Sequence, residues 1–424
     1  MNRKDFIKIS SIFAASTFMP FSETYAGQAP LRVGLVGVHG MGWTNLNAIL
    51  KNVNVRCTAL CDVDENILKK RTAELAERGV DVQAFVSYND MLEKDLVDAV
   101  IIATPDHWHC LQLADVVKAG KHVYLEKPIG NSVQECDIMV KIVENSTSVV
   151  QVGQWQRSQQ HFRDAIDFVH SARLGKIRTV KAWSYVDWKK PIEQKSDTVV
   201  PEGVHYDLWL GPATKRPFNP NRFHFEFRWF WDYAGGLMTD WGVHMLDYAL
   251  LGMRALDPIS VMASGGKYAN PDGASETPDT MSVIYEFKDF SIQWEHAIGL
   301  GLGPYGRNHG VAFIGDKGTL VLNRDGWEVI PEKGKMEAVA LQKPKDNGLE
   351  MHMQNFVQAI TKKDREMVSA PIQVGAHIAV FCQMGNIAYR TGEKLYWDRA
   401  KRKFTNRKAN SYLLAKYHND YKLP

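Results

Sequence analysis

The feature that most constrains the fold is a repeated alternation of short apolar runs and helical segments between residues 31 and 152. Each apolar run is followed by a turn and then, in most units, by a stretch whose apolar residues recur at helical spacing. Such alternation predicts a parallel sheet with helices on both faces, which is a doubly wound α/β domain. The expected strands are Leu31–Gly37, Val53–Cys61, Ala99–Ala103, His122–Glu126 and Val149–Val152.

Helical segments separate these strands. The segment Glu65–Arg78 is amphipathic and rich in charge, and it is stopped by Gly79, a residue that favours the end of a helix. The expected helices are Thr44–Lys51, Glu65–Arg78, Tyr88–Lys94, His109–Ala119 and Val133–Asn145, and Ala84–Val86 is expected to be short and extended.

The pattern changes after Gln154, where extended runs rich in β-branched and aromatic residues begin. These runs predict an α+β domain with an open, mostly antiparallel sheet. Its expected strands are Ile177–Tyr185, Ile259–Ser264, Thr280–Phe287, Ser291–His296, Val311–Ile314, Gly318–Leu322 and Trp327–Ile330. The helices expected with them are Phe162–Ser171, Gly236–Leu251, Met351–Lys362 and Gln373–Thr391.

The length of 424 residues suits two domains with a cleft between them. We expect a nucleotide-binding domain over residues 31–153, an α+β domain over residues 154–400 and a tail over residues 401–424. A net charge of +3 is small for this length and gives no reason to propose nucleic acid or a membrane surface as a partner. The five cysteines lack metal-binding spacing, and we expect all of them to be buried thiols.

The first 26 residues have the features of a targeting segment. Arg3, Lys4 and Lys8 precede a short apolar run from Ile9 to Phe21, and small residues follow at plausible cleavage positions. The start resembles a twin-arginine export signal in which Lys4 replaces the second arginine. An ordinary secretory signal or a ragged N-terminus would fit the same residues. We expect export, with a periplasmic location and no stable membrane anchor.

A glycine-rich turn joins the first strand to the first helix. Its sequence is Gly37-Val38-His39-Gly40-Met41-Gly42, and such a turn lets backbone N–H groups meet a pyrophosphate at the helix N-terminus. The usual Rossmann pattern is G-x-G-x-x-G, so His39 stands where a glycine is common. Asp62 ends the second strand, where a carboxylate can bind ribose hydroxyls and would repel a 2′-phosphate. We therefore expect NAD, although Asp62 could instead cap the following helix.

Two further motifs lie at carboxyl ends of strands, the edge where ligands bind in such sheets. The first supplies Thr104, Pro105, His107 and His109, and the second is Glu126-Lys127-Pro128. Lys127 can point into the crevice, with a cis bond at Pro128 fixing the turn, or it can be an ordinary surface lysine. We assign these residues and Gln154, next to the fifth strand, to the cofactor site.

Asp240 and His244 are four residues apart in a glycine-rich helical segment, so one helix would place them on the same face. A carboxylate beside an imidazole can orient it and raise its basicity. The same spacing could form half of a metal site, but the sequence places no third ligand. It also fits a buried structural histidine. We expect no metal.

Together these motifs resemble the Gfo/Idh/MocA family, which includes glucose–fructose oxidoreductase and inositol dehydrogenase. The resemblance covers nearly the whole chain after residue 30, and Met384–Asp398 resembles the C-terminal end of secreted members from Bacteroidetes-like bacteria. It implies catalytic roles for Lys127, Asp240 and His244: His244 as acid/base, Lys127 as the group that binds and polarises the hydroxyl, Asp240 as support or substrate contact. It also implies a dimer or tetramer formed through the open sheet.

The predicted function is therefore an exported oxidoreductase that moves hydride between tightly held NAD(H) and a carbohydrate or cyclitol hydroxyl. A redox-assisted, NAD-dependent glycosidase and a non-catalytic sugar-binding protein are the alternatives. Aromatic and polar residues near the expected cleft could contact the sugar, and each could equally serve packing. These residues are Trp155, Gln156, Arg157, His161, Tyr185 and Trp231.

Overall fold

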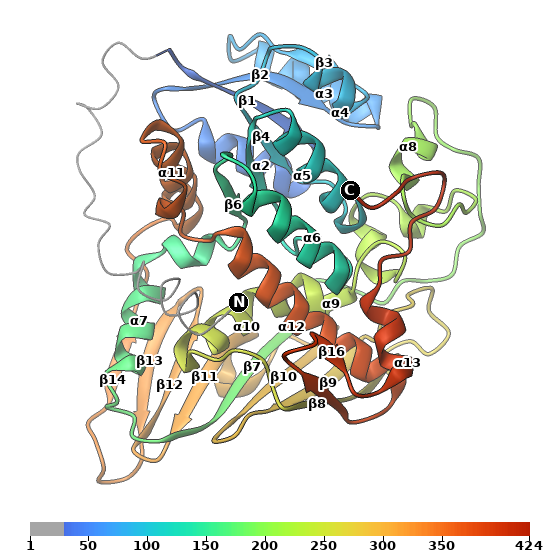
Figure 1. Cartoon of the computed structure of the whole chain (residues 1–424). Coiled ribbons are helices and arrows are strands. Elements are labelled where there is room, and N and C mark those ends of the chain that lie inside the picture. Colours follow the sequence, from blue (N-terminus) through green and yellow to red (C-terminus); the bar gives the residue numbers. More distant parts are fainter. Residues whose placement is uncertain (1–28) are drawn as a thin grey trace.

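The computed structural model describes residues 29–424, and the predicted targeting segment 1–26 lies outside the described residues. The N-terminal domain contains a six-stranded, entirely parallel sheet in the order β3-β2-β1-β4-β5-β6 (Figure 1). This confirms the doubly wound sheet. The expected short extended segment forms the edge strand β3. The strands are β1 (Leu31–Val36), β2 (Val55–Cys61), β3 (Gln83–Phe85), β4 (Ala99–Ile102), β5 (His122–Leu125) and β6 (Val150–Val152).

Helices pack on this sheet because its central strands are apolar on both sides. All four residues of β4, for example, are completely buried. Side-chain caps define two helix starts: Asp64 accepts a hydrogen bond from the Asn66 N–H, and Ser132 accepts one from the Glu135 N–H. The helices are α2 (Gly40–Ile49), α3 (Glu65–Ala76), α4 (Tyr88–Leu92), α5 (His109–Lys118) and α6 (Val133–Glu144).

The C-terminal domain contains a ten-stranded sheet in the order β14-β13-β12-β11-β7-β10-β9-β8-β15-β16. It is mostly antiparallel, as predicted, with β7 and β10 as a parallel pair. The last three strands of the chain order, β14 to β16, were not expected. The strands are β7 (Ile177–Val186), β8 (Ser260–Gly266), β9 (Thr280–Glu286), β10 (Ser291–Ile298), β11 (His309–Gly315), β12 (Gly318–Asn323), β13 (Gly326–Pro331), β14 (Val339–Gln342), β15 (Leu395–Asp398) and β16 (Lys403–Phe404).

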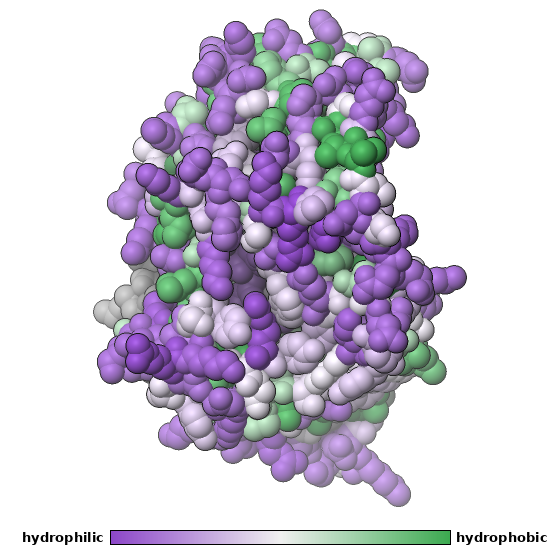
Figure 2. Space-filling view, turned by 90° about the vertical axis from the view of Figure 1, so that its right-hand side faces the viewer, coloured by the Kyte–Doolittle hydropathy of each residue, from purple (hydrophilic) through white to green (hydrophobic). Residues whose placement is uncertain are grey.

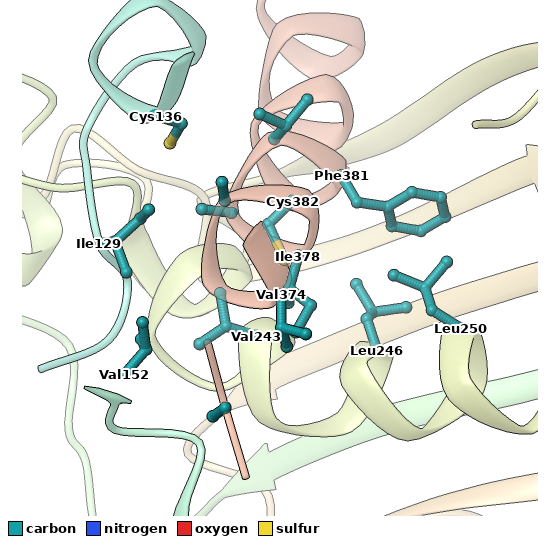
Figure 3. Packing of buried hydrophobic residues seen from close by; sticks show 14 of the residues in the cluster. Ile129, Cys136, Val152, Val243, Leu246, Leu250, Val374, Ile378, Phe381 and Cys382 are labelled. Atoms are coloured by element: carbon teal, nitrogen blue, oxygen red, sulfur yellow. The ribbon is translucent and has the colours of Figure 1, made fainter. Parts of the chain in front are cut away.

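Helix α12 (Ile372–Thr391) lies between the two domains (Figure 1). Figure 3 shows its side chains near Ile129 and Val152 of the N-terminal domain on one side and near Val243, Leu246 and Leu250 on the other. Gly375 allows this close approach, because an added Cβ would lie 2.9 Å from Ile129 and Val152 side-chain atoms. One continuous apolar core therefore joins the domains. The other helices of this half are α7 (Gln160–His170), α8 (Tyr206–Leu210), α11 (Gly348–Thr361) and α13 (Arg407–Asn410).

The helix expected over Gly236–Leu251 is interrupted. It forms α9 (Gly236–Asp240) and α10 (Gly242–Met253), with Trp241 between them at φ −97° and ψ −31°. The break changes the relation of Asp240 to His244, because the two residues lie on different helices. The prediction of one continuous helix was wrong.

Two segments of the second half cross over to the nucleotide-binding domain. In residues 187–235, Val204 bridges to Asp64 and the Glu65 N–H donates to the Gly203 carbonyl at 2.8 Å. The end of the chain also reaches this domain, because the Ala415 N–H donates to Gln134 Oε1 at 3.0 Å. Residues 401–424 are thus not a separate tail. They form β16 and α13 and then pack against the rest of the molecule.

Figure 2 shows the face that carries α8 and the C-terminus, where hydrophilic residues predominate and hydrophobic ones form small separate groups. Over residues 29–424, none of the helices combines the length and apolarity needed to cross a bilayer. All five cysteines are buried and unpaired, as expected.

Candidate active site

A cleft of about 650 Å³ opens between the domains at the carboxyl ends of β1, β2, β4 and β5. This is the edge at which ligands bind in doubly wound sheets. Twelve of the predicted site residues line it: Gly37, His39, Gly40, Met41, Asp62, Thr104, Pro105, Glu126, Lys127, Trp155, Asp240 and His244.

The glycine turn has the shape of a phosphate cradle. Gly37 has φ +90°, and an added Cβ would lie 2.6 Å from the Ala103 carbonyl oxygen. Gly42 does not line the cleft. A Cβ added there would lie 1.9 Å from the Gly37 oxygen, so glycine at this position allows the strand and the helix to pack closely. Gly40, at φ +38°, has open space before it at the start of α2. A dinucleotide pyrophosphate fits this arrangement.

His39 occupies the position that is usually the second glycine of the G-x-G-x-x-G pattern. Its ring stacks on His224 with centroids 5.0 Å apart, and His224 Nε2 lies 2.9 Å from Asp64 Oδ2. The side chain thus joins the turn to residues 187–235 at the edge of the cleft.

Asp62 stands at the end of β2 and lines the cleft. Its carboxylate accepts hydrogen bonds from the Val38 N–H at 2.8 Å and the Asp64 N–H at 3.0 Å. Burial raises its pKa to about 6 despite these bonds. The residue that caps α3 is Asp64, and not Asp62 as in the alternative interpretation. Asp62 is therefore available to ribose hydroxyls.

Lys127 and Asp240 form a buried ion pair. Lys127 Nζ donates to Asp240 Oδ1 at 2.8 Å and to the Asp240 carbonyl at 2.9 Å, and the Lys127–Pro128 peptide bond is cis. Arg228 Nε lies 3.4 Å from the same carboxylate. Burial opposes ionisation of Asp240, but the charges of Lys127 and Arg228 outweigh it and lower its pKa to about 2. Lys127 is a positioned cation and not a surface lysine.

His244 is buried within the cleft wall, and its Nδ1 has no hydrogen-bond partner. Burial holds its pKa well below the usual value, with the charges of Lys127 and Arg324 acting in the same direction. The imidazole is therefore neutral at physiological pH. Asp240 bonds to Lys127 and not to this ring, so the expected orienting contact between Asp240 and His244 is absent from the described structure.

Asp106, Arg228 and Arg324 also line the cleft and were not predicted. Burial raises the pKa of Asp106 to about 8, so its carboxyl is largely protonated at neutral pH. Asp106 stood inside a recognised motif, next to Pro105, and could have been found there. The two arginines lie in segments without a recognisable pattern.

Two family models together span almost the whole described chain. "Oxidoreductase family, NAD-binding Rossmann fold" matches residues 31–154, and "Oxidoreductase family, C-terminal alpha/beta domain" matches residues 158–423. The chain belongs to the Gfo/Idh/MocA family. The match confirms the predicted resemblance and an NAD-binding domain.

The individual relatives of this Gfo/Idh/MocA protein share only modest sequence identity with it. Glycosyl hydrolase family 109 protein 2 of Shewanella sp. (strain ANA-3) is 31% identical over 168 residues, which cover 34% of this chain and 37% of that protein. The chain thus aligns with little more than a third of that relative. WlbA dehydrogenase from Bordetella pertussis, solved with NADH and UDP-GlcNAcA, has 21% identity and a TM-score of 0.64, covering 87% of this chain and 99% of that one. Aldose-aldose oxidoreductase from Caulobacter crescentus has 18% identity, the same TM-score and the same coverage.

Three other residues predicted for the cofactor site of this family member face the protein interior. His107 Nε2 lies 3.1 Å from the Trp209 carbonyl, and His109 bridges the carbonyls of Pro128 and Thr104 at 2.8 and 2.9 Å. Gln154 is buried outside the cleft lining. The histidines thus fix the turns that carry the lining residues, and their assignment as cofactor contacts stays a prediction.

Of the predicted sugar contacts, only Trp155 lines the cleft. Four of the other five bond to protein groups outside the cleft lining, and both side-chain polar atoms of the fifth, Gln156, are buried without a hydrogen-bond partner. Arg157 forms a buried ion pair with Asp247 at 2.5 Å, His161 Nε2 lies 3.0 Å from the Asn323 carbonyl, and Gln156 is buried. Tyr185 bonds to Glu295 and Trp231 to the Glu276 carbonyl. The metal alternative gains no support, since the described residues hold no group of three potential ligands.

Proposed function

We propose that the protein is an NAD-dependent oxidoreductase that moves hydride between a retained cofactor and the carbon of a carbohydrate or cyclitol hydroxyl. The observation that carries this proposal is the meeting of a neutral His244 and the positioned Lys127 in the cleft that also holds the glycine turn. A proton acceptor and a fixed cation are the two groups that such a reaction needs.

The residues that would hold NAD are the turn Gly37–Met41 at the pyrophosphate and Asp62 at a ribose. Thr104 and Pro105 line the cleft between that turn and Lys127 along the sheet edge. NAD supplies the hydride acceptor when bound.

The chain's own residues manage the proton. A neutral imidazole can accept the hydroxyl proton, and the His244 pKa places it in that form. Lys127, fixed by two hydrogen bonds to Asp240, can hold the hydroxyl oxygen and stabilise the negative charge that develops there. Arg228 keeps Asp240 ionised, so the lysine stays in place.

A redox-assisted glycosidase is the second candidate. The similarity to a glycosyl hydrolase family 109 protein favours it, because that relative is 31% identical over the aligned segment. In this scheme, transient oxidation of the sugar by NAD would acidify a neighbouring C–H bond, and the aglycone would leave by elimination. Addition of water and return of the hydride to the sugar would complete the hydrolysis. The same cleft residues serve both reactions.

We also propose that the protein is exported and forms a homo-oligomer. The basic and apolar composition of the N-terminal segment supports export, and the long sheet of the C-terminal domain offers a surface for association. Free NAD is scarce outside the cytoplasm, so an exported enzyme would have to keep and recycle its cofactor.

The deciding experiment uses protein purified without added cofactor. Denaturation should release NAD, measured by its absorbance, and native protein is then given free sugars and nitrophenyl glycosides in turn. Build-up of bound NADH with a free sugar supports the oxidoreductase. Release of nitrophenol without added NAD supports the glycosidase instead. Absence of both reactions, with no dinucleotide released, would overturn the proposal.

A further inference from the structure

The turn between β12 and β13 places one arginine in the cleft. Arg324 follows Asn323, the last residue of β12, and lines the cleft near Trp155 and Trp241. The turn is firmly held, since Asn323 Nδ2 donates to Asp325 Oδ2 at 2.9 Å and accepts at Oδ1 from Arg307 Nη1 at 3.1 Å. The arginine therefore projects from a fixed part of the sheet.

Two tryptophan rings hold the Arg324 guanidinium. Its Cζ lies 5.0 Å from the centroid of the Trp155 ring and 4.7 Å from that of Trp241. Contacts of this kind occupy the faces of the planar group and leave its N–H donors directed outward in its plane. The guanidinium is thus pre-oriented to receive a planar acceptor from one direction.

No carboxylate of the described residues lies within 4.0 Å of this guanidinium, and its Nε is buried without a hydrogen-bond partner. The other two cations nearby, Lys127 and Arg228, both contact Asp240. Arg324 therefore differs from these two cations in that no protein carboxylate contacts it directly, although Asp240 and Asp325 act on it from a longer distance.

Charge at this end of the cleft is positive. The three cations Lys127, Arg228 and Arg324 outnumber the carboxylates of Asp240 and Glu126, because the Asp106 pKa of about 8 leaves that group largely protonated at neutral pH. Burial lowers the Arg324 pKa to about 10, which still leaves it charged. Arg324 acts electrostatically on His244 and Asp240, so it belongs to the reacting end and not to the pyrophosphate end.

We propose that the substrate carries a carboxylate and that the in-plane N–H donors of Arg324 bind it, which makes the enzyme selective for uronic acids or their glycosides. This inference rests on the proposed function and names its substrate class. A buried arginine without an anion lacks compensation, and a carboxylate restores it through two parallel hydrogen bonds. A neutral hydroxymethyl group accepts one bond and leaves the charge unbalanced. The acidic sugar is therefore preferred over its neutral counterpart.

Binding can be measured apart from catalysis, because Trp155 and Trp241 flank the guanidinium and report by fluorescence. Holoenzyme is titrated with glucuronate, galacturonate and mannuronate, and with glucose, galactose and mannose as neutral partners. At least one acid should bind at least about tenfold tighter than its neutral partner, given the strength of charge-assisted hydrogen bonds. R324Q should abolish this preference, and R324K should restore part of it.

A matched control lies outside the cleft. The Arg390 guanidinium is held in the same way, 4.8 Å from the Trp231 centroid and 4.4 Å from that of Tyr412, but does not line the cleft. R390Q should keep the acid preference while losing the same kind of ring contact. This separates anion binding from general destabilisation.

Three results would overturn the inference. In the first, each acid binds with the same affinity as its neutral partner. In the second, R324Q weakens binding of the acidic and the neutral sugars equally. In the third, the enzyme binds a sulfated sugar selectively and shows no preference for any uronate. Reduction of bound NAD by neutral sugars would then leave the proposed function standing. If no sugar reduces bound NAD but R324Q still removes uronate binding, the proposed function fails while the anion site survives.

Discussion

At the scale of single residues, the cleft is organised around one carboxylate. Asp240 holds Lys127 at 2.8 Å and Arg228 at 3.4 Å, so its charge fixes the cation that faces the substrate. Because its pKa of about 2 lies below the usual value, this contribution to stability is complete above about pH 4 and is lost as pH falls toward 2. The ion pair is therefore intact throughout the physiological range.

Replacing the proton acceptor should slow the reaction without releasing the cofactor. H244A removes the imidazole, and loss of a positioned acid/base group lowers turnover by about 10² to 10⁴-fold. The measurement is the rate of NADH formation on the enzyme in a single turnover. Copurified NAD and melting temperature serve as controls and should stay near wild type. Unchanged turnover would remove His244 from the mechanism.

Asp106 should make the free protein less stable as pH rises. Its pKa is raised by burial from about 4 in the unfolded chain to about 8, so between these values the folded state holds a proton that the unfolded state releases. The free energy of unfolding falls over this window, and D106N should remove that fall. Melting temperatures of cofactor-free protein from pH 5 to 9 test this.

The control for this titration is D207N, because the Asp207 side chain is 82% exposed. That variant should follow the wild-type pH profile. Parallel profiles for wild type and D106N would show that Asp106 ionises normally in the folded protein.

The sequence singled out Lys127, Asp240 and His244, because they occur in recognisable strings, but it wrongly placed Asp240 and His244 on one helix. It could not predict Arg324, which is a lone residue in a turn brought to the cleft by sheet pairing. It also assigned His109 to the cofactor, although two carbonyls hold its ring. The sequence around a motif does not reveal which of its residues face the protein interior and which face the cleft.

At the scale of elements, the empty space beside the glycine turn before α2 allows a test of where NAD binds. Gly40 has φ +38° and no atom within 4 Å of an added Cβ, so asparagine fits there without the protein moving. The side chain would occupy space assigned to the pyrophosphate, so G40N should weaken NAD binding at least about tenfold. Equilibrium dialysis of NAD against cofactor-free protein measures this.

G79N is the matched control. Gly79 also has positive φ and open surroundings, but it lies outside the cleft lining. Both variants place asparagine at a positive φ and should lose a similar, small amount of stability without cofactor, whereas only G40N should lose affinity for NAD. Equal NAD affinity of G40N and wild type would move the pyrophosphate away from this turn.

Most elements were predictable because each has a strong period. The buried strands β1, β2, β4, β5 and β6 were expected close to their observed bounds. The break at Trp241 was not, since nothing in the residues around it forbids a continuous helix. Strand β14 was missed as well, because three of its four residues are exposed and it lacks a clear alternation.

At the scale of the whole molecule, the cleft is closed by two distant parts of the chain. Trp209, in residues 187–235, accepts hydrogen bonds at its carbonyl from His107 and Trp108, both at the end of the nucleotide-binding sheet. Tyr421 packs edge-on against Trp108 with centroids 5.4 Å apart and lines the cleft. Because Trp108, Trp209 and Tyr421 all line the cleft, we expect these contacts to restrain a bound dinucleotide.

Removing one of these contacts should speed cofactor loss. Y421A deletes the ring beside Trp108, and we expect the enzyme to retain several-fold less NAD after prolonged dialysis. Y421F keeps the ring and should behave as wild type. The ratio of NAD to protein after dialysis is the measurement. Full retention by Y421A would show that the chain end does not restrain the cofactor.

The order of the cleft residues along the chain has a consequence for biosynthesis. The nucleotide-binding sheet is complete once residue 152 has left the ribosome, and domains generally fold as they emerge. The cleft wall, however, also includes Arg324 and Tyr421, which are translated much later. A nascent chain can therefore form the nucleotide-binding sheet well before it can form the complete cleft.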